Sequence, residues 1–416
     1  MKNFIAIIFS LISIISFGQQ ISLEELTNGA LSNFSFDKNV ETLNNINNFN
    51  QSNADKNYLP SLNFGVLASY QSDVTSLPIE LPNLEVPTPP KGQYRATLNV
   101  NQVIYDGNAT KQQKVLIDNI HQAEIIKVEN QKRAIKEKVS ELFFAALSVE
   151  KTNEILHLKL EELNQREKTL KTAVEQGVLL NASLMEFQAE RLKLINQIDN
   201  LNKQQESIST SLSSFTGLNI TQNNSFSTPA FETIAALNVE ERTDIKVLNA
   251  NKSILSTQAE MQNIKSKPKV MAFGTAGYGR PGLNMLSDQL DPYYIVGAKL
   301  SWDFWDWGET NNQKQIIALQ QNLITEKEEN LKTQISISYD NFLTEIEQLE
   351  QTIETDKQLI KLRGQIKKAY ATQLDNGTLS ATDYLKYLNA EQEALLQKQQ
   401  NEIQLLKTKQ QLLLMQ

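Results

Sequence analysis

The sequence contains no cysteine and only two histidines, His121 and His157. Without cysteine the chain can form no disulfide bridge, no thiolate metal site and no cysteine nucleophile. The two histidines are too far apart along the chain to share a local metal motif. A nucleophile elbow, a phosphate-binding loop and the familiar metal-binding spacings are also missing. We therefore expect no enzyme activity, no metal site and no cofactor.

Positive charge is also scarce. The 40 Lys and Arg residues are outnumbered by 48 Asp and Glu residues, and the formal net charge is −8. Nucleic-acid binding depends on a basic surplus that releases counterions, so no nucleic-acid partner is expected. Beyond the first residues, no apolar run is long enough for a transmembrane helix.

Residues 1–18, MKNFIAIIFSLISIISFG, have the features of a secretory signal peptide. Lys2 supplies a positive start, an apolar run follows from Phe4 to Phe17, and the small residues Ser16 and Gly18 suit cleavage. An N-terminal membrane anchor is the alternative, but the run is shorter than the about 20 residues of a membrane span. The sequence therefore predicts an exported chain.

Two long stretches of the sequence have almost no helix breakers. Residues 108–216 contain no proline and one glycine, Gly177, whereas residues 309–416 contain no proline and two glycines, Gly364 and Gly377. Both stretches are rich in Gln, Lys, Glu, Leu, Ile and Ala, which favour helices. Each stretch is predicted to form a helical hairpin, with Gly177 or Gly377 just past the end of its first helix.

The hairpins and the shorter segments around them predict two repeats of one unit: helix, β-hairpin, long helix, turn, helix. The first repeat, 19–220, contains a helix at 23–56, a β-hairpin at 61–104, a long helix at 108–176 and a returning helix at 179–216. The second repeat, 221–416, contains a helix at 239–265, a β-hairpin at 268–306, a long helix at 309–376 and a returning helix at 379–416.

Helices of this length cannot enclose a globular core, so they must pack side by side as coiled coils. Apolar residues recur at alternating steps of four and three in both long helices. The first seam is Ile135, Val139, Leu142, Ala146 and Val149, and the second is Phe342, Ile346, Leu349, Ile353 and Ile360, interrupted by Asp356. The returning helices could be capped by Asn181 or Ser183 in the first repeat and by Ser380 or Thr382 in the second.

The predicted strands alternate apolar and polar residues. The pattern is clear in SLNFGVLASYQ, YRATLNVN and YIVGAKLSW, and weaker in KVMAFGTAGYG. Such alternation predicts strands with one apolar face. The proline-rich loop near 73–92 joins the first pair of strands and cannot be helical.

The two repeats align at a constant shift of 200 positions. Identical residues occupy equivalent positions in both: Tyr94 and Tyr294, Asp106 and Asp306, Thr110 and Thr310, Gln113 and Gln313, Lys114 and Lys314, Gly177 and Gly377, Leu179 and Leu379. Asp106 and Asp306 precede the long helices and are interpreted as caps.

The apolar strand face could belong to a small soluble β-sandwich or could contact lipid. Aromatic residues gather at the strand ends, as in the girdles of membrane barrels. The candidate girdle consists of Tyr70, Tyr94, Tyr294, Trp302, Trp305 and Trp307. Four strands cannot close a barrel, and an open sheet edge is not tolerated in lipid. Strands in a membrane would therefore require the chain to oligomerise.

The order of these elements, the YDG and WDWG strand-to-helix junctions, and the QGVLLNASLMEFQAE and NGTLSATDYLKYLNAEQ hairpins resemble the TolC-like outer-membrane efflux proteins. The resemblance covers nearly the whole mature chain. It implies a homotrimer in which each subunit gives four strands to one shared barrel in outer-membrane lipid. The helices would form a periplasmic α-barrel. It also implies a passive exit duct that works with a periplasmic adaptor (membrane fusion) protein and an inner-membrane pump, for efflux or type I secretion.

The resemblance also implies a constriction at the helical turns. The family's acid six residues after the turn glycine corresponds to Asp383 in the second repeat and to Ser183 in the first. A further acid of some members is replaced here by Lys386, so the ring would carry both charges. Asp383 could instead only support the start of its helix. Adaptor contact is implied at the turns, which include Gly177, Leu179, Gly377 and Leu379, although Leu179 and Leu379 could equally pack within their own hairpins.

A soluble periplasmic coiled-coil adaptor or scaffold is the alternative function. An adaptor would be expected to carry a compact β-rich domain within one helical hairpin. Here the strands are distributed in pairs between two helical hairpins, which favours the channel.

Overall fold

The computed structural model describes residues 20–76, 88–231 and 236–415. The predicted signal peptide lies outside the described residues, as does the middle of the loop near 73–92. The helices are α1 (Leu23–Asn33), α2 (Phe36–Asp55), α3 (Ala109–Glu175), α4 (Asn181–Thr216), α5 (Thr243–Lys265), α6 (Glu309–Asp375) and α7 (Ala381–Leu414). Short 3-10 helices, η1 (Lys56–Tyr58) and η2 (Val239–Glu241), and strands β1 (Ser61–Tyr70), β2 (Gly92–Tyr105), β3 (Lys269–Arg280) and β4 (Asp291–Ser301) complete the elements.

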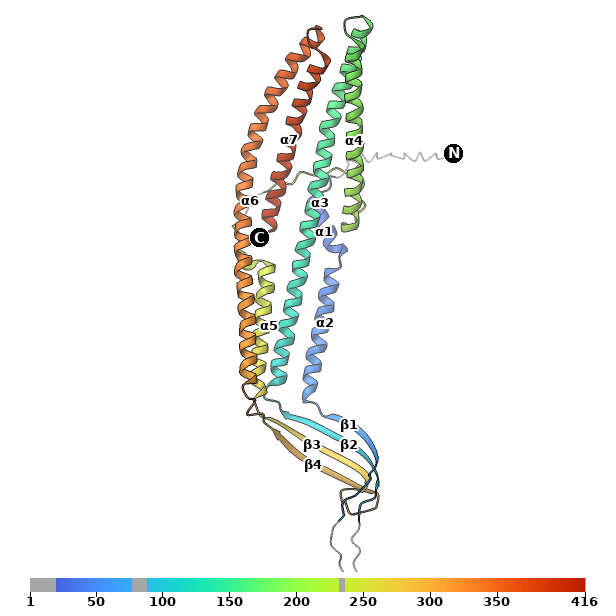
Figure 1. The fold of residues 1–416 in the computed structure, drawn as a ribbon, viewed down its shortest axis with the longest axis vertical. Helices are drawn as coiled ribbons and strands as arrows, with labels where there is room; N and C mark the ends of the chain where they lie inside the picture. The colour runs from blue at the N-terminus through green and yellow to red at the C-terminus, as the bar shows by residue number, and fades with distance from the viewer. Residues whose placement is uncertain (1–19, 77–87, 232–235, 416) are drawn as a thin grey trace, which may run out of the picture. The chain divides into compact units, whose positions relative to one another are not determined.

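The predicted combination of long helical hairpins and four antiparallel strands in two repeats is confirmed (Figure 1). The long helices α3 and α6 have 67 residues each, which corresponds to about 100 Å at a rise of about 1.5 Å per residue. Within the described ranges, none of the helices combines the length and the apolarity that a bilayer crossing requires.

The predicted helix 23–56 is wrong as a single element, because it is divided into α1 and α2. Ser35 lies between them in the left-handed region, with φ 51°. The side-chain amide of Asn33 donates hydrogen bonds to the carbonyls of Ser214 and Phe215, 3.2 and 3.1 Å away at the end of α4. The break therefore accompanies a tertiary contact of Asn33, and no glycine or proline marks it in the sequence.

The chain divides into two compact units. Unit 1 comprises residues 1–37, 128–243 and 331–416, and unit 2 comprises residues 38–127 and 244–330. The helices α3 and α6 contribute residues to both.

One core of unit 1 forms where α1, α3 and α4 meet the segment that follows α4. Phe143 and Phe144 are buried, and their rings pack edge to face at 5.3 Å. Phe226 packs edge to face on Phe143 at 5.8 Å. The residues before Phe226 are tied to the N-terminal segment, since the N–H of Ile21 donates to the carbonyl of Ser225 at 2.9 Å. The cluster thus holds the start of the described chain against the long helix α3.

In the predicted seam of α3, Val139 and Ala146 lie in this core, and Val149 is also buried. On α6, Ile353 of the second seam is also buried. Asp356 is 8% exposed, and its carboxylate accepts a hydrogen bond from the amide of Asn401 on α7 at 2.6 Å. Asp356 therefore continues the buried stripe with a polar contact between helices.

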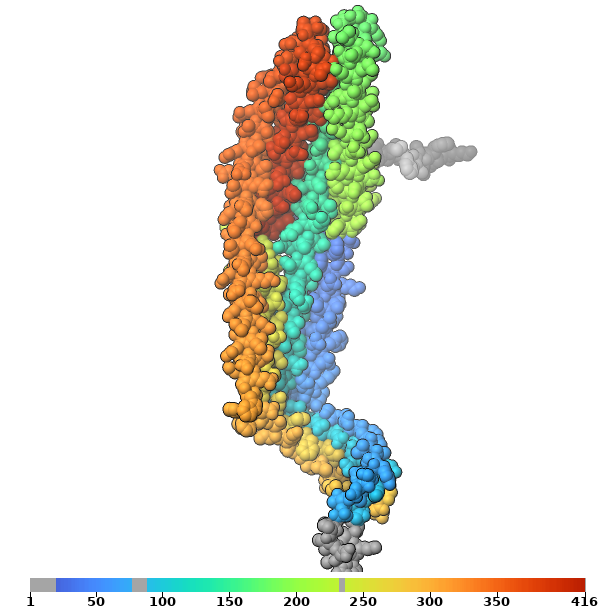
Figure 2. All heavy atoms as spheres, viewed as in Figure 1, coloured from blue at the N-terminus to red at the C-terminus, as the bar shows by residue number. Residues whose placement is uncertain are grey.

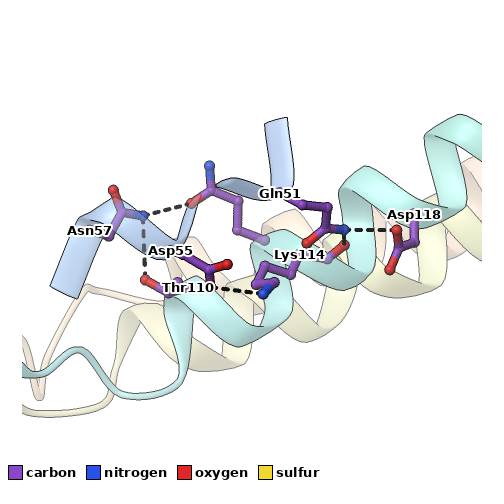
Figure 3. A network of polar contacts seen from close by, with 7 residues as sticks. Gln51, Asp55, Asn57, Thr110, Lys114 and Asp118 are labelled. Atoms are coloured by element: carbon purple, nitrogen blue, oxygen red, sulfur yellow. Dashed lines mark hydrogen bonds and ion pairs between the residues drawn. The ribbon is translucent and has the colours of Figure 1, made fainter. Parts of the chain in front are cut away.

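In unit 2, polar side chains fix α2 against the start of α3 (Figure 3). The Gln51 amide donates to the Lys114 carbonyl at 2.9 Å and to the Asp118 carboxylate at 2.7 Å. Lys114 also forms an ion pair with Asp55 at 2.8 Å. Asn57 donates to the Thr110 hydroxyl at 3.3 Å, which places η1 over the first turn of α3.

The four strands form one antiparallel sheet in the order β1-β2-β3-β4. The register pairs Val66 with Ala96, Leu98 with Ala276, and Gly274 with Val296. Paired residues share a face and successive residues alternate, so even-numbered residues occupy one face. Many of these even-numbered side chains are apolar and exposed: Leu62, Phe64, Val66, Leu98, Val296 and Leu300. The sheet of unit 2 thus has an exposed apolar face.

The two strand-to-helix junctions are built alike, as the repeat predicts. Asp106 accepts hydrogen bonds from the N–H groups of Asn108 at 2.9 Å and Thr110 at 2.7 Å. Asp306 accepts from the equivalent N–H groups of Gly308 and Thr310, at 3.0 and 2.9 Å. Burial raises the pKa of Asp106, but hydrogen bonds from the Thr110 and Tyr58 side chains and from these N–H groups outweigh it, so this pKa lies below its ordinary value. Hydrogen bonds from the side chain and the N–H of Thr310 lower the pKa of Asp306 in the same way. Both aspartates cap their helices, as predicted.

An Asp106→Ala variant is expected to lose more stability than an Asp306→Ala variant. Each change removes a helix cap, which costs about 1 kcal/mol. Asp106 also accepts a 2.7 Å hydrogen bond from the Tyr58 hydroxyl, and its loss costs roughly another 0.5–1.5 kcal/mol. Denaturant unfolding of the two purified variants would measure the difference. Equal losses would show that the Tyr58 contact contributes nothing.

Candidate functional site

The two turns that close the helical hairpins have the same backbone geometry. Gly177 and Gly377 adopt φ values of 74° and 70°, which suit glycine. In the first turn the N–H groups of Gly177 and Val178 donate to the carbonyls of Val174 and Ala173, at 3.0 and 2.9 Å. The second turn repeats both bonds at 3.0 Å. These bonds give hydrogen-bond partners to carbonyls in the last turns of α3 and α6, and they reverse the chain direction within a few residues.

The two returning helices begin differently. Ser380 is the N-cap of α7: its side chain accepts from the N–H of Asp383 at 3.1 Å and donates to the Asp383 carboxylate at 2.7 Å. The N-cap of α4 is Leu180, which makes no side-chain cap bond. The prediction that Asn181 or Ser183 caps α4 is therefore wrong, because the helix begins one residue earlier than a cap at Asn181 requires and three residues earlier than a cap at Ser183 requires.

The two turns lie next to each other within unit 1, at the green and red ends of the hairpins (Figure 2). A Cβ atom at Gly377 would lie 3.8 Å from a methyl group of Val178. The Thr382 hydroxyl of α7 also donates to the Glu186 carboxylate of α4 at 2.6 Å. The hairpins therefore touch at their ends.

Leu179 and Leu379 are half-buried and pack against a core cluster that contains Phe187, Tyr384 and Leu388. Val178 and Leu180, which flank Leu179, are instead 61% and 77% exposed. These two exposed apolar side chains were not singled out from the sequence, although the run GVLL contains both.

Below the turns, α3 is joined to α6 and α7 by a network of charged and hydroxyl groups. Arg166 forms an ion pair with Asp375 at 2.7 Å. Glu162 accepts from the Tyr384 hydroxyl at 2.9 Å and pairs with Lys367 at 2.9 Å. We call these five residues the inter-hairpin network. None was predicted from the sequence, because its partners lie about 200 positions apart.

Burial strengthens the contacts of this network. Tyr384 has no exposed surface, and burial together with the nearby Glu162 carboxylate raises its pKa to about 12. Its ring stacks on Phe187 at 6.0 Å and lies 5.3 Å below the Arg166 guanidinium. Burial lowers the pKa of Lys367, but its bonds to Glu391 and Glu162 outweigh that effect and raise it. The hydroxyl and the ammonium therefore stay protonated as donors.

Among the predicted gate residues, Asp383 and Lys386 are both exposed on the first turns of α7, and Ser183 is half-buried near the start of α4. Asp383 also receives the hydrogen bond from Ser380, so it supports the helix start. The residue after Lys386, Tyr387, stacks face to face with Tyr370 of α6 at 3.8 Å.

The candidate girdle residues lie near both ends of the sheet, and all are exposed. Tyr70, Tyr94 and Tyr294 lie toward the end at which β1 ends and β2 begins. Trp302, Trp305 and Trp307 follow β4 at the opposite end. The Trp302 indole N–H donates to the Ser266 carbonyl at 2.9 Å.

No family model and no curated protein matches the sequence. Solved structures do match it. The outer membrane protein VceC from Vibrio cholerae has a TM-score of 0.70 and 15% identity, over 94% of this chain and 94% of that chain. The chain has the fold of the TolC-like outer-membrane channels.

Two other solved structures of outer membrane channels are also similar to this chain. The CmeC outer membrane channel of Campylobacter jejuni has a TM-score of 0.69 and 13% identity over 93% of this chain and 83% of its own. The open state of the MtrE outer membrane channel of Neisseria gonorrhoeae has a TM-score of 0.71 and 13% identity over 94% and 88%. At these identities the likeness establishes the TolC-like fold, and the similarity spans almost all of the chain.

Proposed function

We propose that this protein is an outer-membrane channel, the exit duct of a tripartite efflux or type I secretion system. It would be a passive conduit and not an enzyme. The observation that carries the proposal is the sheet: its even-numbered face exposes apolar side chains such as Leu62, Phe64 and Val296, which are 71%, 70% and 73% exposed. Together with the similarity of the fold to solved outer-membrane channels, this favours burial of that face in lipid.

The sheet also indicates why several copies are needed. Among the described residues it ends at β1 on one side and at β4 on the other. Unpaired backbone groups on these edges would have no hydrogen-bond partner in a bilayer. Pairing β4 of one copy with β1 of the next removes both edges, and three copies would close one shared barrel. A homotrimer in the outer membrane, with its helices extending into the periplasm, is the assembly we propose.

The turns are the proposed periplasmic gate. Asp383 and Lys386 lie exposed beside the second turn, with Ser183 at the equivalent place in the first repeat. The inter-hairpin network would hold the second hairpin against the first and so set the width of the opening. A periplasmic adaptor, itself docked on an inner-membrane pump, would contact the turns that include Gly177, Leu179, Gly377 and Leu379. The exposed Val178 and Leu180 offer it an apolar contact.

The proposal predicts that the protein purified in detergent from outer-membrane fractions inserts into planar lipid bilayers and gives discrete conductance steps. A scaffold of the periplasm would give none. The matched comparison is Thr97→Arg, which places a charge on the opposite face of the sheet and should still be recovered from these fractions and conduct. A protein that is recovered from the soluble periplasmic fraction and does not conduct would contradict the channel function.

A further inference from the structure

The face of the sheet opposite the lipid face carries a net positive charge, although the whole chain is negatively charged. It contains the odd-numbered strand residues, whose side chains are largely neutral and polar. Thr275 on β3, for example, donates a hydrogen bond to Asn99 on β2 at 2.8 Å. Within the described strands the charged residues of this face are Arg95, Lys269, Lys299 and Asp291. The face thus carries three cations and one acid, whereas the whole chain has a formal charge of −8.

The register places these charges along the face. Arg95 and Asp291 both pair with Gly279, so they lie in one row with strand β3 between them. The positive charge of Arg95 is therefore partly offset. Lys269 pairs with Ser301, and Lys299 pairs with Met271, near the end of the sheet that leads into the helices. Within the strands, this end of the face carries two cations and no acid.

The two lysines are diagonal neighbours, because Lys299 precedes the partner of Lys269 by two residues. Diagonal neighbours on one face lie about 7–8 Å apart, and like charges at such sites repel. Lys269, Lys299 and Arg95 are exposed, and none forms an ion pair with another described residue. The repulsion is therefore not relieved within the chain, and mobile anions are the groups that would relieve it.

We propose that this face makes the strand part of the conduit selective for anionic solutes, with Lys269, Lys299 and Arg95 as the residues that determine the selectivity. The inference rests on the proposed function. In the proposed channel, the polar face of each copy lines a common lumen. Every added copy repeats the same surplus of positive charge. Clefts lined by one sign of charge concentrate ions of the opposite sign.

The effect has an expected size and salt dependence. A unit charge about 10 Å from an ion in water changes the local ion concentration by about twofold. The Debye length falls from about 10 Å at 0.1 M salt to about 3 Å at 1 M. At 0.1 M screening reduces the interaction energy of a single charge at this distance to about a third, but the three cations of every copy act together. A preference of the order of twofold is therefore expected at 0.1 M, and it should largely disappear at 1 M.

The test is the reversal potential of single channels in planar bilayers across a potassium chloride gradient. The triple variant R95Q/K269Q/K299Q is expected to lower the chloride-to-potassium permeability ratio by about twofold. The matched control R95K/K269R/K299R keeps the three charges and should keep the ratio. Both variants are first compared with the parent protein by heat-modifiable migration, so that only assembled channels are measured.

The outcomes separate the two proposals. A ratio unchanged by R95Q/K269Q/K299Q in a conducting channel would overturn the anion selectivity and leave the channel function intact. A drop in the ratio for the control as large as that for the neutral variant would also overturn it, because charge would not be the cause. The absence of any conductance from the parent protein would overturn the channel function and this inference with it.

Discussion

A Leu98→Arg variant is expected to be lost from the outer membrane, whereas a Thr97→Arg variant is expected to assemble there and conduct. The two residues are neighbours in the middle of β2, and the alternation of the strand puts them on opposite faces of the sheet. Leu98 is on the apolar face and 46% exposed. An arginine facing lipid at the centre of a membrane barrel costs about 2–4 kcal/mol. A trimer would incur this cost three times.

The measurement is the amount of each variant in outer-membrane fractions and its migration with and without heating. Both variants add the same side chain to the same strand, so general effects on export and strand propensity cancel. Equal recovery of Leu98→Arg and the parent protein would place the apolar face outside the membrane. Equal loss of both variants would show that neither face tolerates charge, as in the core of a soluble sandwich.

The second large effect is expected from the inter-hairpin network. The double variant Glu162→Ala/Arg166→Ala removes the contacts of α3 with Tyr384, Lys367 and Asp375. A hydrogen bond to a charged group contributes about 1.5–3 kcal/mol when partly buried. Losing even one would shift the equilibrium between a narrow and a wide opening by roughly tenfold or more. The open probability of single channels should therefore rise by at least this factor.

A matched control exists on the same helix. Lys151 and Glu154 form an ion pair three residues apart on α3, and within the described residues neither side chain forms an ion pair or hydrogen bond with another helix. The variant Lys151→Ala/Glu154→Ala removes one cation and one anion from α3, as the network variant does, but leaves the hairpins joined. If both double variants open the channel equally, the effect comes from α3 itself. If neither does, the inter-hairpin network does not control the opening.

Much of the fold could be predicted because its signals are local. The alternation in SLNFGVLASYQ and YRATLNVN depends only on neighbouring residues, and it placed β1 and β2 within a few positions of their observed bounds. The absence of proline between 309 and 416 likewise indicated α6 and α7. The shift of 200 positions then related the two halves, and the places of Asp106 and Asp306 directly before the long helices indicated that they are caps.

The features that sequence reasoning missed depend on contacts between distant segments. Helix α1 ends at Asn33, whose side chain donates hydrogen bonds to the last turn of α4. Nothing in the sequence distinguishes Asn33 from any other helical asparagine. The inter-hairpin network has the same origin. A coiled-coil seam predicts that a helix has a partner but not which helix it is, so the Glu162 bond to Tyr384 could not be foreseen.

In the proposed assembly, separate copies of this chain share one barrel in the outer membrane. The most direct test is the mass of the detergent-extracted particle from outer-membrane fractions, after the contribution of bound detergent is subtracted. A mass about three times that of the mature chain is expected, because the proposed assembly contains three copies. A monomer in the soluble periplasmic fraction would contradict it, because the edges of β1 and β4 would then have no partner and the apolar face no lipid.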